Sequence, residues 1–182
     1  MAEFPDSYTN WKQAKLVAPR IQLIPLEEID FDKIYQLAAN PLVWSQHPNK
    51  NRYLLHEFET YFKGAIESRG AYKIQQLDTG KWMGCTRYYD FDPIGKSILI
   101  GYTFLGLDYW QQGYNQELKK CMVEHAFKYV NKILFHIGAT NFRSQKSIEA
   151  FGAVKIGEID QAYYGEPVKP NFIYEIKNPI QR

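Results

Sequence analysis

Two apolar segments separated by a helical one constrain the fold of this chain more than any other feature. Residues Ser97–Leu105, SILIGYTFL, are apolar on both faces, as expected for a strand buried in the middle of a sheet. Residues 115–130 carry apolar positions at helical spacing, and Lys132–Gly138, KILFHIG, has the pattern of a second strand. Because a helix lies between the two strands, we expect them to pair in parallel through a right-handed crossover.

The other segments predict a mixed α/β (α+β) sheet of about seven strands, mostly antiparallel, flanked by about four helices. Further strands are expected at residues 21–24, 71–77, 82–91, 154–160 and 171–176. Further helices are expected at residues 26–40, 57–69 and 143–151, with an irregular segment at 41–54. We expect residues 1–19 to form an N-terminal arm and residues 20–182 to form a single domain.

Charge and residue usage exclude several classes of function. The net charge is +2 over 182 residues and no strongly basic face is evident, so we expect no nucleic-acid partner. Cys85 and Cys121 are far apart and the four histidines show no ligand spacing, so we expect no metal site and a reducing compartment. The chain begins without an apolar signal segment and contains no run of membrane-spanning length, which favours a cytoplasmic protein without a membrane partner.

A polar stretch joins the first buried strand to the following helix. It reads DYWQQGYNQELKK from Asp108 to Lys120. Gly113 lets the backbone approach a ligand closely, Asn115 can cap the helix, and Gln111 and Gln112 can donate amide hydrogen bonds. Because the N-terminus of a helix favours anions, the stretch can cradle a phosphate. It matches neither a Walker loop nor a Rossmann fingerprint, and for this stretch taken alone a plain turn with a helix cap is the better explanation.

The second strand is followed by a comparable stretch, NFRSQKSIEAFGA, from Asn141 to Ala153. Asn141 stands at the end of the strand and Ser144 at the start of the next helix, where helix capping alone would explain both residues. The two strands should be neighbours, however, so we expect both polar stretches to face one cleft.

At these two stretches the chain resembles the GNAT superfamily, the Gcn5-related N-acetyltransferases. YWQQGYNQE and NFRSQKSIEAFGA are similar to the branch of ribosomal-protein N-terminal acetyltransferases (RimJ/RimL-like), and GCTRYYDFDP and ILIGYTFL fit the central strands of that branch. The resemblance covers residues 20–177. It implies the GNAT fold, with a parallel pair of strands that splays apart after residues 97–105, and acetyl-coenzyme A as the acyl donor.

The resemblance also implies which residues bind the cofactor. The backbone of Tyr102, Thr103, Phe104 and Leu105 would face the pantetheine arm and the thioester. The pyrophosphate would lie on Gln111, Gln112, Gly113, Tyr114 and Asn115. Asn141 would bond the pantetheine, Ser144 would lie near the thioester sulfur, and Arg143 and Lys146 would meet the adenosine phosphates.

The chain departs from the family pattern at several positions. Trp110 and Asn115 replace the usual ends of the phosphate loop, Ala153 replaces an aromatic residue, and Asp160 replaces an arginine. Many members carry a tyrosine that protonates the leaving thiolate, and the matching residue here is Ile148. Ser144 is the best substitute for this acid. A module of the same fold that binds coenzyme A or a partner without turnover is therefore the alternative to an enzyme.

The implied reaction is direct transfer of an acetyl group from the thioester to a primary amine in a ternary complex. The amine must lose a proton, and the candidates for the base are Glu158, Asp160 and Tyr163. A backbone N–H of residues 102–105 could hold the oxyanion. The acceptor can be a protein N-terminus or a small-molecule amine, and a homodimer is an open alternative to a monomer.

Overall fold

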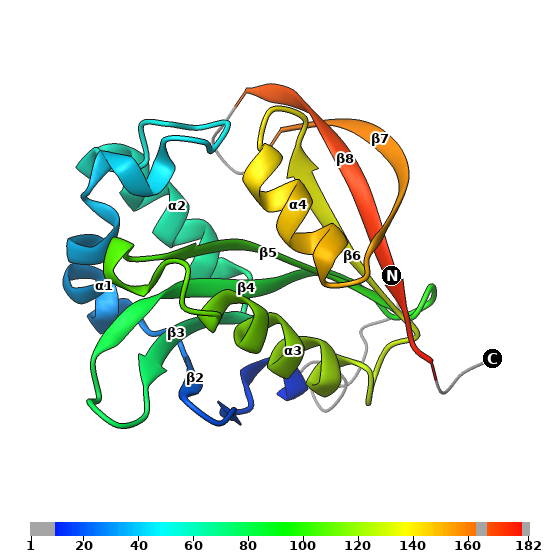
Figure 1. The fold of residues 1–182 in the computed structure, drawn as a ribbon, viewed down its shortest axis with the longest axis horizontal. Helices are drawn as coiled ribbons and strands as arrows, with labels where there is room; N and C mark the ends of the chain where they lie inside the picture. Colours follow the sequence, from blue (N-terminus) through cyan, green and yellow to red (C-terminus); the bar gives the residue numbers. More distant parts are fainter. Residues whose placement is uncertain (1–9, 163–166, 180–182) are drawn as a thin grey trace.

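One twisted, mostly antiparallel sheet organises the molecule (Figure 1). The computed structural model describes residues 10–162 and 167–179. The sheet has eight strands in the order β1-β2-β3-β4-β5-β6-β8-β7. Their bounds are β1 Leu16–Val17, β2 Ile21–Pro25, β3 Ala71–Gln76, β4 Trp82–Asp92, β5 Ser97–Leu105, β6 Lys132–Gly138, β7 Val154–Ala162 and β8 Val168–Lys177. The predicted mixed sheet is confirmed, and the strand beyond the expected seven is the two-residue β1.

Four α-helices cover the two faces of this sheet. They are α1 Phe31–Ala38, α2 Leu55–Glu67, α3 Tyr114–Ala126 and α4 Phe142–Ala150. Short 3-10 turns cover Asn10–Gln13, Glu28–Asp30, Pro41–Trp44 and Leu107–Tyr109. The helix expected at 26–40 therefore begins with a 3-10 turn, and α3 ends four residues before Val130.

Each face of the sheet has its own hydrophobic core. On one face, α1 and α2 bury side chains such as Ile34 and Phe58. On the other, α3 and α4 bury Leu118, Met122 and Ile148. In Figure 1, α3 and α4 accordingly lie in front of the strands, and both faces of the central strands are covered, which explains their apolar runs.

The parallel pair β5 and β6 is short. Pairing extends from Ser97 opposite Lys132 to Leu99 opposite Leu134, and the strands then diverge. The predicted splay is present, but it begins inside β5 instead of after its end. From Ile100 onward this side of β5 has no ladder partner in the described chain, and that gap in the sheet positions the site.

A β-bulge adds to the distortion of β5. Cys85 on β4 pairs with Phe104, but Arg87 pairs with Gly101, so β5 contains one residue more than β4 over this interval. The extra residue is accommodated at Tyr102, whose φ is 52°. Its carbonyl accepts a hydrogen bond of 2.6 Å from the Tyr61 hydroxyl on α2 instead of from a strand.

The segment before β2 packs against the domain. The Trp11 ring is buried and stacks on Tyr129 with ring centroids 4.8 Å apart, and its carbonyl lies 2.9 Å from Nε2 of His125. Only part of the arm expected at 1–19 can be assessed in this way, because residues 1–9 lie outside the described residues.

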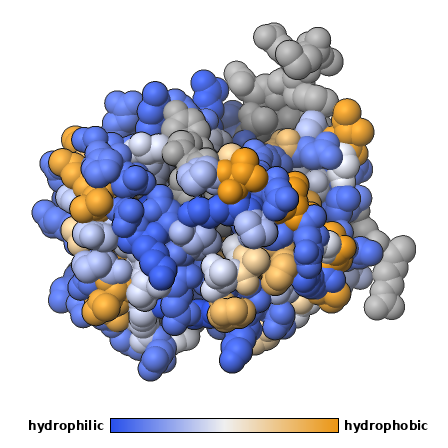
Figure 2. Space-filling view, turned by 90° about the horizontal axis from the view of Figure 1, so that it is seen from above, coloured by the Kyte–Doolittle hydropathy of each residue, from blue (hydrophilic) through white to orange (hydrophobic). Residues whose placement is uncertain are grey.

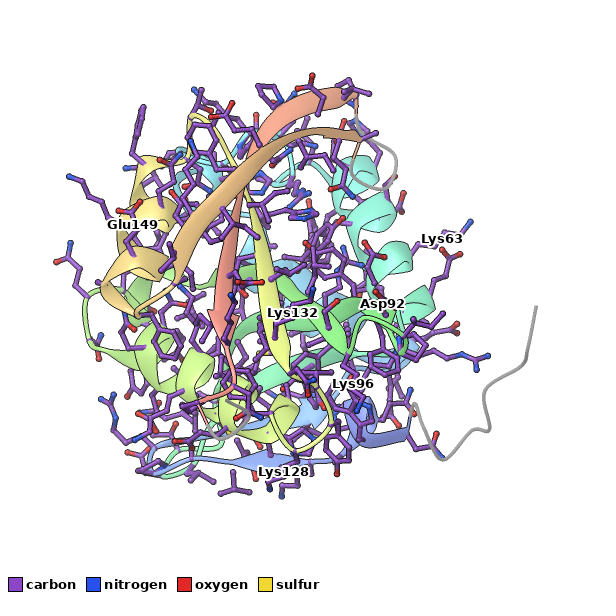
Figure 3. The ribbon with its side chains drawn as sticks, turned by 90° about the vertical axis from the view of Figure 1, so that its right-hand side faces the viewer. Lys63, Asp92, Lys96, Lys128, Lys132 and Glu149 are labelled. Atoms are coloured by element: carbon purple, nitrogen blue, oxygen red, sulfur yellow. The ribbon has the colours of Figure 1, made fainter. Side chains whose placement is uncertain are left out.

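The face of the molecule shown in Figure 2 is mainly polar. Apolar residues on the face shown in Figure 2 form small groups among hydrophilic ones. Figure 3 shows Lys63 projecting away from α2, and Glu149 on α4, where its carboxylate accepts a 2.9 Å hydrogen bond from Tyr174 of β8. No helix in the described part of the chain is long and apolar enough to cross a membrane.

Candidate active site

A cavity of about 540 Å³ opens where β5 and β6 diverge. Its walls come from β5, the loop after it, the first turns of α3, β6, α4 and the segment around residues 43–52. Gly113 and Asn141, from the two polar stretches of the sequence, both line it. The stretches therefore converge on one cleft. The other predicted cofactor residues on its walls are Tyr102, Thr103, Phe104, Leu105, Gln111, Tyr114, Asn115, Arg143 and Ser144.

The loop before α3 presents its backbone to this cavity. Gln111 and Gly113 have φ angles of 59° and 81°, left-handed values that turn the chain sharply into the helix. Among the described residues, the backbone N–H groups of residues 111–115 have no hydrogen-bond acceptor. Unpaired N–H groups at a helix N-terminus form an anion site.

The side chains of this loop differ from the sequence expectation. Gly113, not Asn115, is the N-cap residue of α3, and the Asn115 amide instead donates to Ser147 Oγ at 3.1 Å. The Gln112 amide donates to the carbonyl of Asp108 and does not line the cavity. Asn115 lies inside the first helical turn, and its side chain reaches α4 instead of capping the helix.

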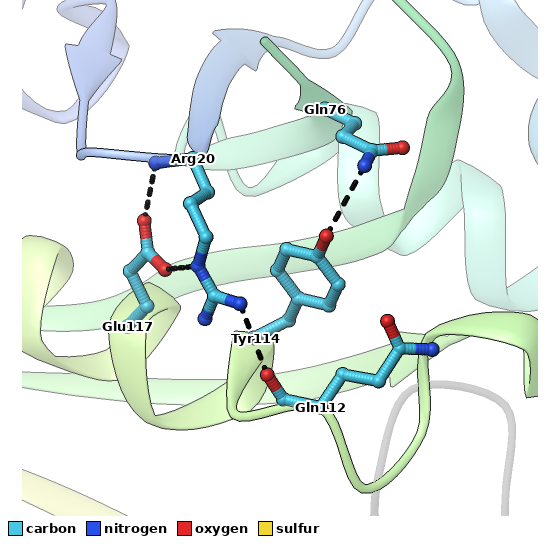
Figure 4. Close-up of polar contacts among 5 residues, drawn as sticks. All are labelled: Arg20, Gln76, Gln112, Tyr114 and Glu117. Carbon is cyan, nitrogen blue, oxygen red and sulfur yellow. Dashed lines mark hydrogen bonds and ion pairs between the residues drawn. The ribbon is translucent and has the colours of Figure 1, made fainter. Parts of the chain in front are cut away.

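Arg20 fixes the loop from outside (Figure 4). Its Nε donates to Glu117 Oε2 at 2.7 Å, and its Nη1 donates to the Gln112 carbonyl at 3.1 Å. The guanidinium lies over the Tyr114 ring, and the Tyr114 hydroxyl accepts from Gln76 at 3.1 Å. Glu117 thus pairs with an arginine that lies 97 residues away in sequence, a contact that no local pattern indicates.

The second stretch begins α4. Asn141 is the N-cap residue, with Oδ1 accepting from the Ser144 N–H at 3.3 Å, so its capping role and its place in the cavity coexist. Arg143 lies over the Trp110 ring at 4.2 Å and connects the two stretches. Lys146, predicted to meet adenosine phosphates, does not line the cavity.

Two of the three predicted base residues, Glu158 and Asp160, lie outside the lining of the cavity. Glu158 and Asp160 are exposed on the edge strand β7 and do not line the cavity. Glu158 Oε1 pairs with Lys155 Nζ at 2.8 Å. Strand β8 separates both residues from β6. Tyr163 lies outside the described residues.

Two histidines that line the cavity are held neutral. Burial lowers the pKa of His136, and its Nδ1 lies 2.6 Å from Gln161 Oε1. Because an amide oxygen only accepts, this nitrogen carries the proton. Burial and the Arg52 guanidinium lower the pKa of His47 well below its ordinary value. Sequence reasoning gave no role to His136, since a lone histidine in an apolar strand has no distinguishing signal.

The cavity has a positive electrostatic bias. Arg52, Lys119 and Arg143 line it, and no aspartate or glutamate among residues 10–162 and 167–179 does. The same described residues contain no group of three or more His, Cys, Asp or Glu side chains placed to hold a metal ion. Such a site is suited to a polyanionic ligand.

Comparison with known proteins identifies the family. The sequence model of the Acetyltransferase (GNAT) domain matches residues 20–154, so the chain belongs to the GNAT family of N-acetyltransferases. No curated protein matches the sequence significantly.

Solved structures share the fold at low identity. A GCN5-related N-acetyltransferase from Brucella melitensis aligns with a TM-score of 0.78 and 16% identity, covering 91% of this chain and 79% of that one. The ribosomal L7/L12 acetyltransferase RimL, in complex with coenzyme A, aligns with a TM-score of 0.71 and 17% identity, covering 90% of this chain and 98% of that one. Spermidine N-acetyltransferase from Vibrio cholerae, in complex with coenzyme A and spermine, aligns with a TM-score of 0.66 and 16% identity, covering 87% of this chain and 95% of that one.

Acetyltransferases of this family use acetyl-coenzyme A, and the cavity fits that group. The unpaired N–H groups of residues 111–115 suit a pyrophosphate, and the unpaired side of β5 suits the amides of a pantetheine arm.

Proposed function

We propose that the cavity binds acetyl-coenzyme A between β5 and β6 and that the protein transfers the acetyl group directly to a primary amine. The observation that carries this proposal is the set of backbone N–H groups at residues 111–115 that have no acceptor among the described residues, in a loop that lines the cavity at the gap in the sheet. A helix N-terminus of this kind concentrates donors and a positive dipole at one point.

The cofactor would lie along β5. Gln111, Gly113, Tyr114 and Asn115 would hold its pyrophosphate, chiefly through the backbone. The backbone of residues 102–105 would bond the pantetheine like an added strand. Part of this edge is already used, because the Leu105 carbonyl accepts from the Trp110 indole at 2.8 Å.

On α4, Asn141 would bond the pantetheine and Ser144 would lie near the sulfur. Bound acetyl-coenzyme A supplies an activated acyl thioester, so the protein chiefly has to hold the acceptor close and in the right orientation. The bulge at Tyr102 interrupts the ladder in the unpaired part of β5, where a backbone N–H of residues 102–105 can stabilise a developing oxyanion.

The acceptor amine must be neutral to react, and His136 is the cavity residue best suited to remove its proton. The lowered pKa keeps the ring neutral near pH 7, and the hydrogen bond to Gln161 directs Nε2 to be the proton acceptor. Glu158 and Asp160 remain candidates acting through water, and Tyr163 remains a candidate outside the described residues.

The test is direct binding followed by turnover. Calorimetry should detect coenzyme A binding, and incubation of acetyl-coenzyme A with a panel of primary amines and N-terminal peptides should release free thiol and give acetylated product by mass spectrometry. A protein that binds no coenzyme A, or that acetylates no amine of a broad panel, would contradict the proposal.

A further inference from the structure

Lys119 on α3 is a buried ammonium group in the wall of the cavity. Its residue is 9% exposed. Within the described chain its hydrogen-bond partner is Ser147 Oγ on α4, at 3.0 Å, and it forms no ion pair there. Lys73 is buried to a similar degree, but its Nζ bonds both carboxylate oxygens of Asp30, at 2.9 and 2.7 Å. Lys119 thus differs from Lys73 by having no carboxylate partner among the described residues.

The polar side chains beside Lys119 on α3 are hydrogen-bond donors that converge on Ser147. Asn115, one helical turn earlier, also donates to Ser147 Oγ, at 3.1 Å, and Gln116 donates to the Ser147 carbonyl at 3.3 Å. All four residues line the cavity. Ser147 therefore accepts hydrogen bonds from all three α3 side chains. Because Ser147 is neutral, the positive charge of Lys119 stays uncompensated.

An uncompensated buried charge is destabilising. The position of Lys119 in the cavity wall therefore suits an anionic ligand that would pair with it. Burial lowers the pKa of Lys119 to about 8. The ionisable groups of the surrounding elements are Tyr114, Glu117, Lys120, Cys121, Glu124 and His125 on α3, Arg143, Lys146 and Glu149 on α4, and Lys132 and His136 on β6. None of them shifts this pKa, which burial alone lowers.

The position of Lys119 along α3 favours the leaving thiolate over the pyrophosphate as the anionic group that it meets. Lys119 is six residues beyond Gly113, which is about 9 Å along a helix axis. It lies beyond the phosphate cradle along α3 and bonds Ser147, which directly precedes Ile148 on α4, and all three residues line the cavity. Ser144, proposed to lie near the sulfur, is three residues before Ser147 and so on the same side of α4.

We infer that Lys119, acting through the Ser147 hydroxyl, stabilises and protonates the thiolate that leaves during acetyl transfer. This inference rests on the proposed function. Because Lys119 acts through Ser147, it is a positioning residue for the leaving group.

The step is balanced. The amine nitrogen forms a bond to the acetyl carbon, the carbon–sulfur bond breaks, and its electron pair stays on sulfur. A proton moves from the Lys119 ammonium through the hydroxyls of α4 to sulfur, and the neutral lysine regains a proton from solvent. The surplus proton of the amine goes to the base on the acceptor side.

The first test measures the thiol without any turnover. Near-ultraviolet absorbance of bound coenzyme A reports its thiolate, and the thiol should ionise more readily in the wild-type complex than in Lys119→Met, with an ionisation constant about tenfold higher. Lys120→Met is the matched control, because Lys120 is exposed on the same helix and pairs only with Glu124 at 3.9 Å within the described residues. It should match wild type. An unchanged thiol pKa in Lys119→Met overturns the inference.

The second test separates binding from catalysis. Lys119→Met should lower kcat about tenfold or more while leaving the dissociation constant of coenzyme A within about twofold. Wild-type kcat should decline above about pH 8, because the ammonium form is the active one, and Lys119→Arg should move this decline to higher pH. A dissociation constant raised about tenfold with unchanged kcat would make Lys119 a phosphate ligand and overturn the inference.

These outcomes are distinct from failure of the proposed function. A wild-type protein that binds coenzyme A and acetylates amines, with Lys119→Met behaving like Lys120→Met, overturns only the role of Lys119. A wild-type protein that binds no coenzyme A overturns the proposed function and this inference together. Melting temperatures of the variants show whether misfolding causes a loss of activity. We expect Lys119→Met to melt no lower than wild type, because it removes an unpaired buried charge.

Discussion

At the scale of single residues, the site depends on backbone conformations and protonation states that few side chains can replace. Gly113 begins α3 at a φ of 81°, where an added Cβ would meet Arg20 Nη2 at 3.4 Å. His136 lines the same cavity with a pKa lowered by burial. Each residue supports a prediction that separates its chemical role from its structural one.

Gly113→Glu should abolish coenzyme A binding while the domain stays folded. The variant places a side chain and a negative charge where the phosphate should lie, and it adds about 1–2 kcal/mol of backbone strain. Gly80→Glu is the control, because Gly80 has a φ of 68° in the turn between β3 and β4 and does not line the cavity. Calorimetric titration with coenzyme A checks the result, and equal affinity of Gly113→Glu and wild type would contradict the phosphate site.

His136→Gln should lower kcat/KM about 100-fold and remove the acidic limb of its pH profile. The base must be neutral, and burial lowers the pKa of His136 below its ordinary value, so wild-type activity should rise through a pKa below 6.5 and level off at neutral pH. His56→Gln, an exposed position on α2, should leave the profile unchanged. A limb that persists in His136→Gln would assign the base to another group.

Ser144→Ala should slow turnover more than it weakens cofactor binding. The proposed role of the hydroxyl is in passing a proton to the leaving sulfur, which affects the reaction more than the bound ground state. Single-turnover rates and coenzyme A dissociation constants, measured side by side, check this expectation. An unchanged rate would remove Ser144 from the mechanism.

At the scale of elements, the phosphate loop depends on a contact between β2 and α3. Arg20 immediately precedes β2, and its backbone N–H and its Nε both donate to the Glu117 carboxylate, each at 2.7 Å. The same side chain reaches the Gln112 carbonyl, inside the loop. The contact with Arg20, just before β2, therefore orders the loop, while the N–H groups of the loop stay available for the ligand.

Arg20→Met should weaken coenzyme A binding about fivefold with little change in kcat, because the loop must then be ordered by the ligand. Global stability should change only slightly, since half-exposed ion pairs contribute little. Lys63→Met is the control, because it removes a surface contact with Glu67 on α2. Affinity in Arg20→Met equal to wild type would show that the loop is ordered without this contact.

At the scale of the whole molecule, the distribution of charge separates the cavity from the rest of the surface. The chain has 22 basic and 20 acidic residues, yet within the described residues the cavity is lined by arginine and lysine and by no carboxylate. A low-dielectric cleft of one sign concentrates ligands of the opposite sign and repels like charges. This bias bears on the acceptor as well as on the cofactor.

Spermidine should therefore be a poor acceptor, with kcat/KM about tenfold or more below that of a monoamine that also carries a carboxylate. Raising the salt concentration should narrow the difference, because screening weakens the field. Parallel kinetics on the two amines at low and moderate salt check this. A preference for spermidine would indicate that carboxylates outside the described residues face the acceptor.

The sequence alone determined the order of the elements, the parallel junction and the two polar stretches, because periodicity, turn residues and helix starts are local properties of the chain. SILIGYTFL and KILFHIG identified the central strands to the residue. Tertiary structure decided which side chains meet. It paired Arg20 with Glu117, buried Lys119 against Ser147, turned Asn115 from a cap into a bridge to α4, and left Glu158 and Asp160 on an exposed edge. Such contacts join residues far apart in sequence, so only the packing of helices on the sheet fixes them.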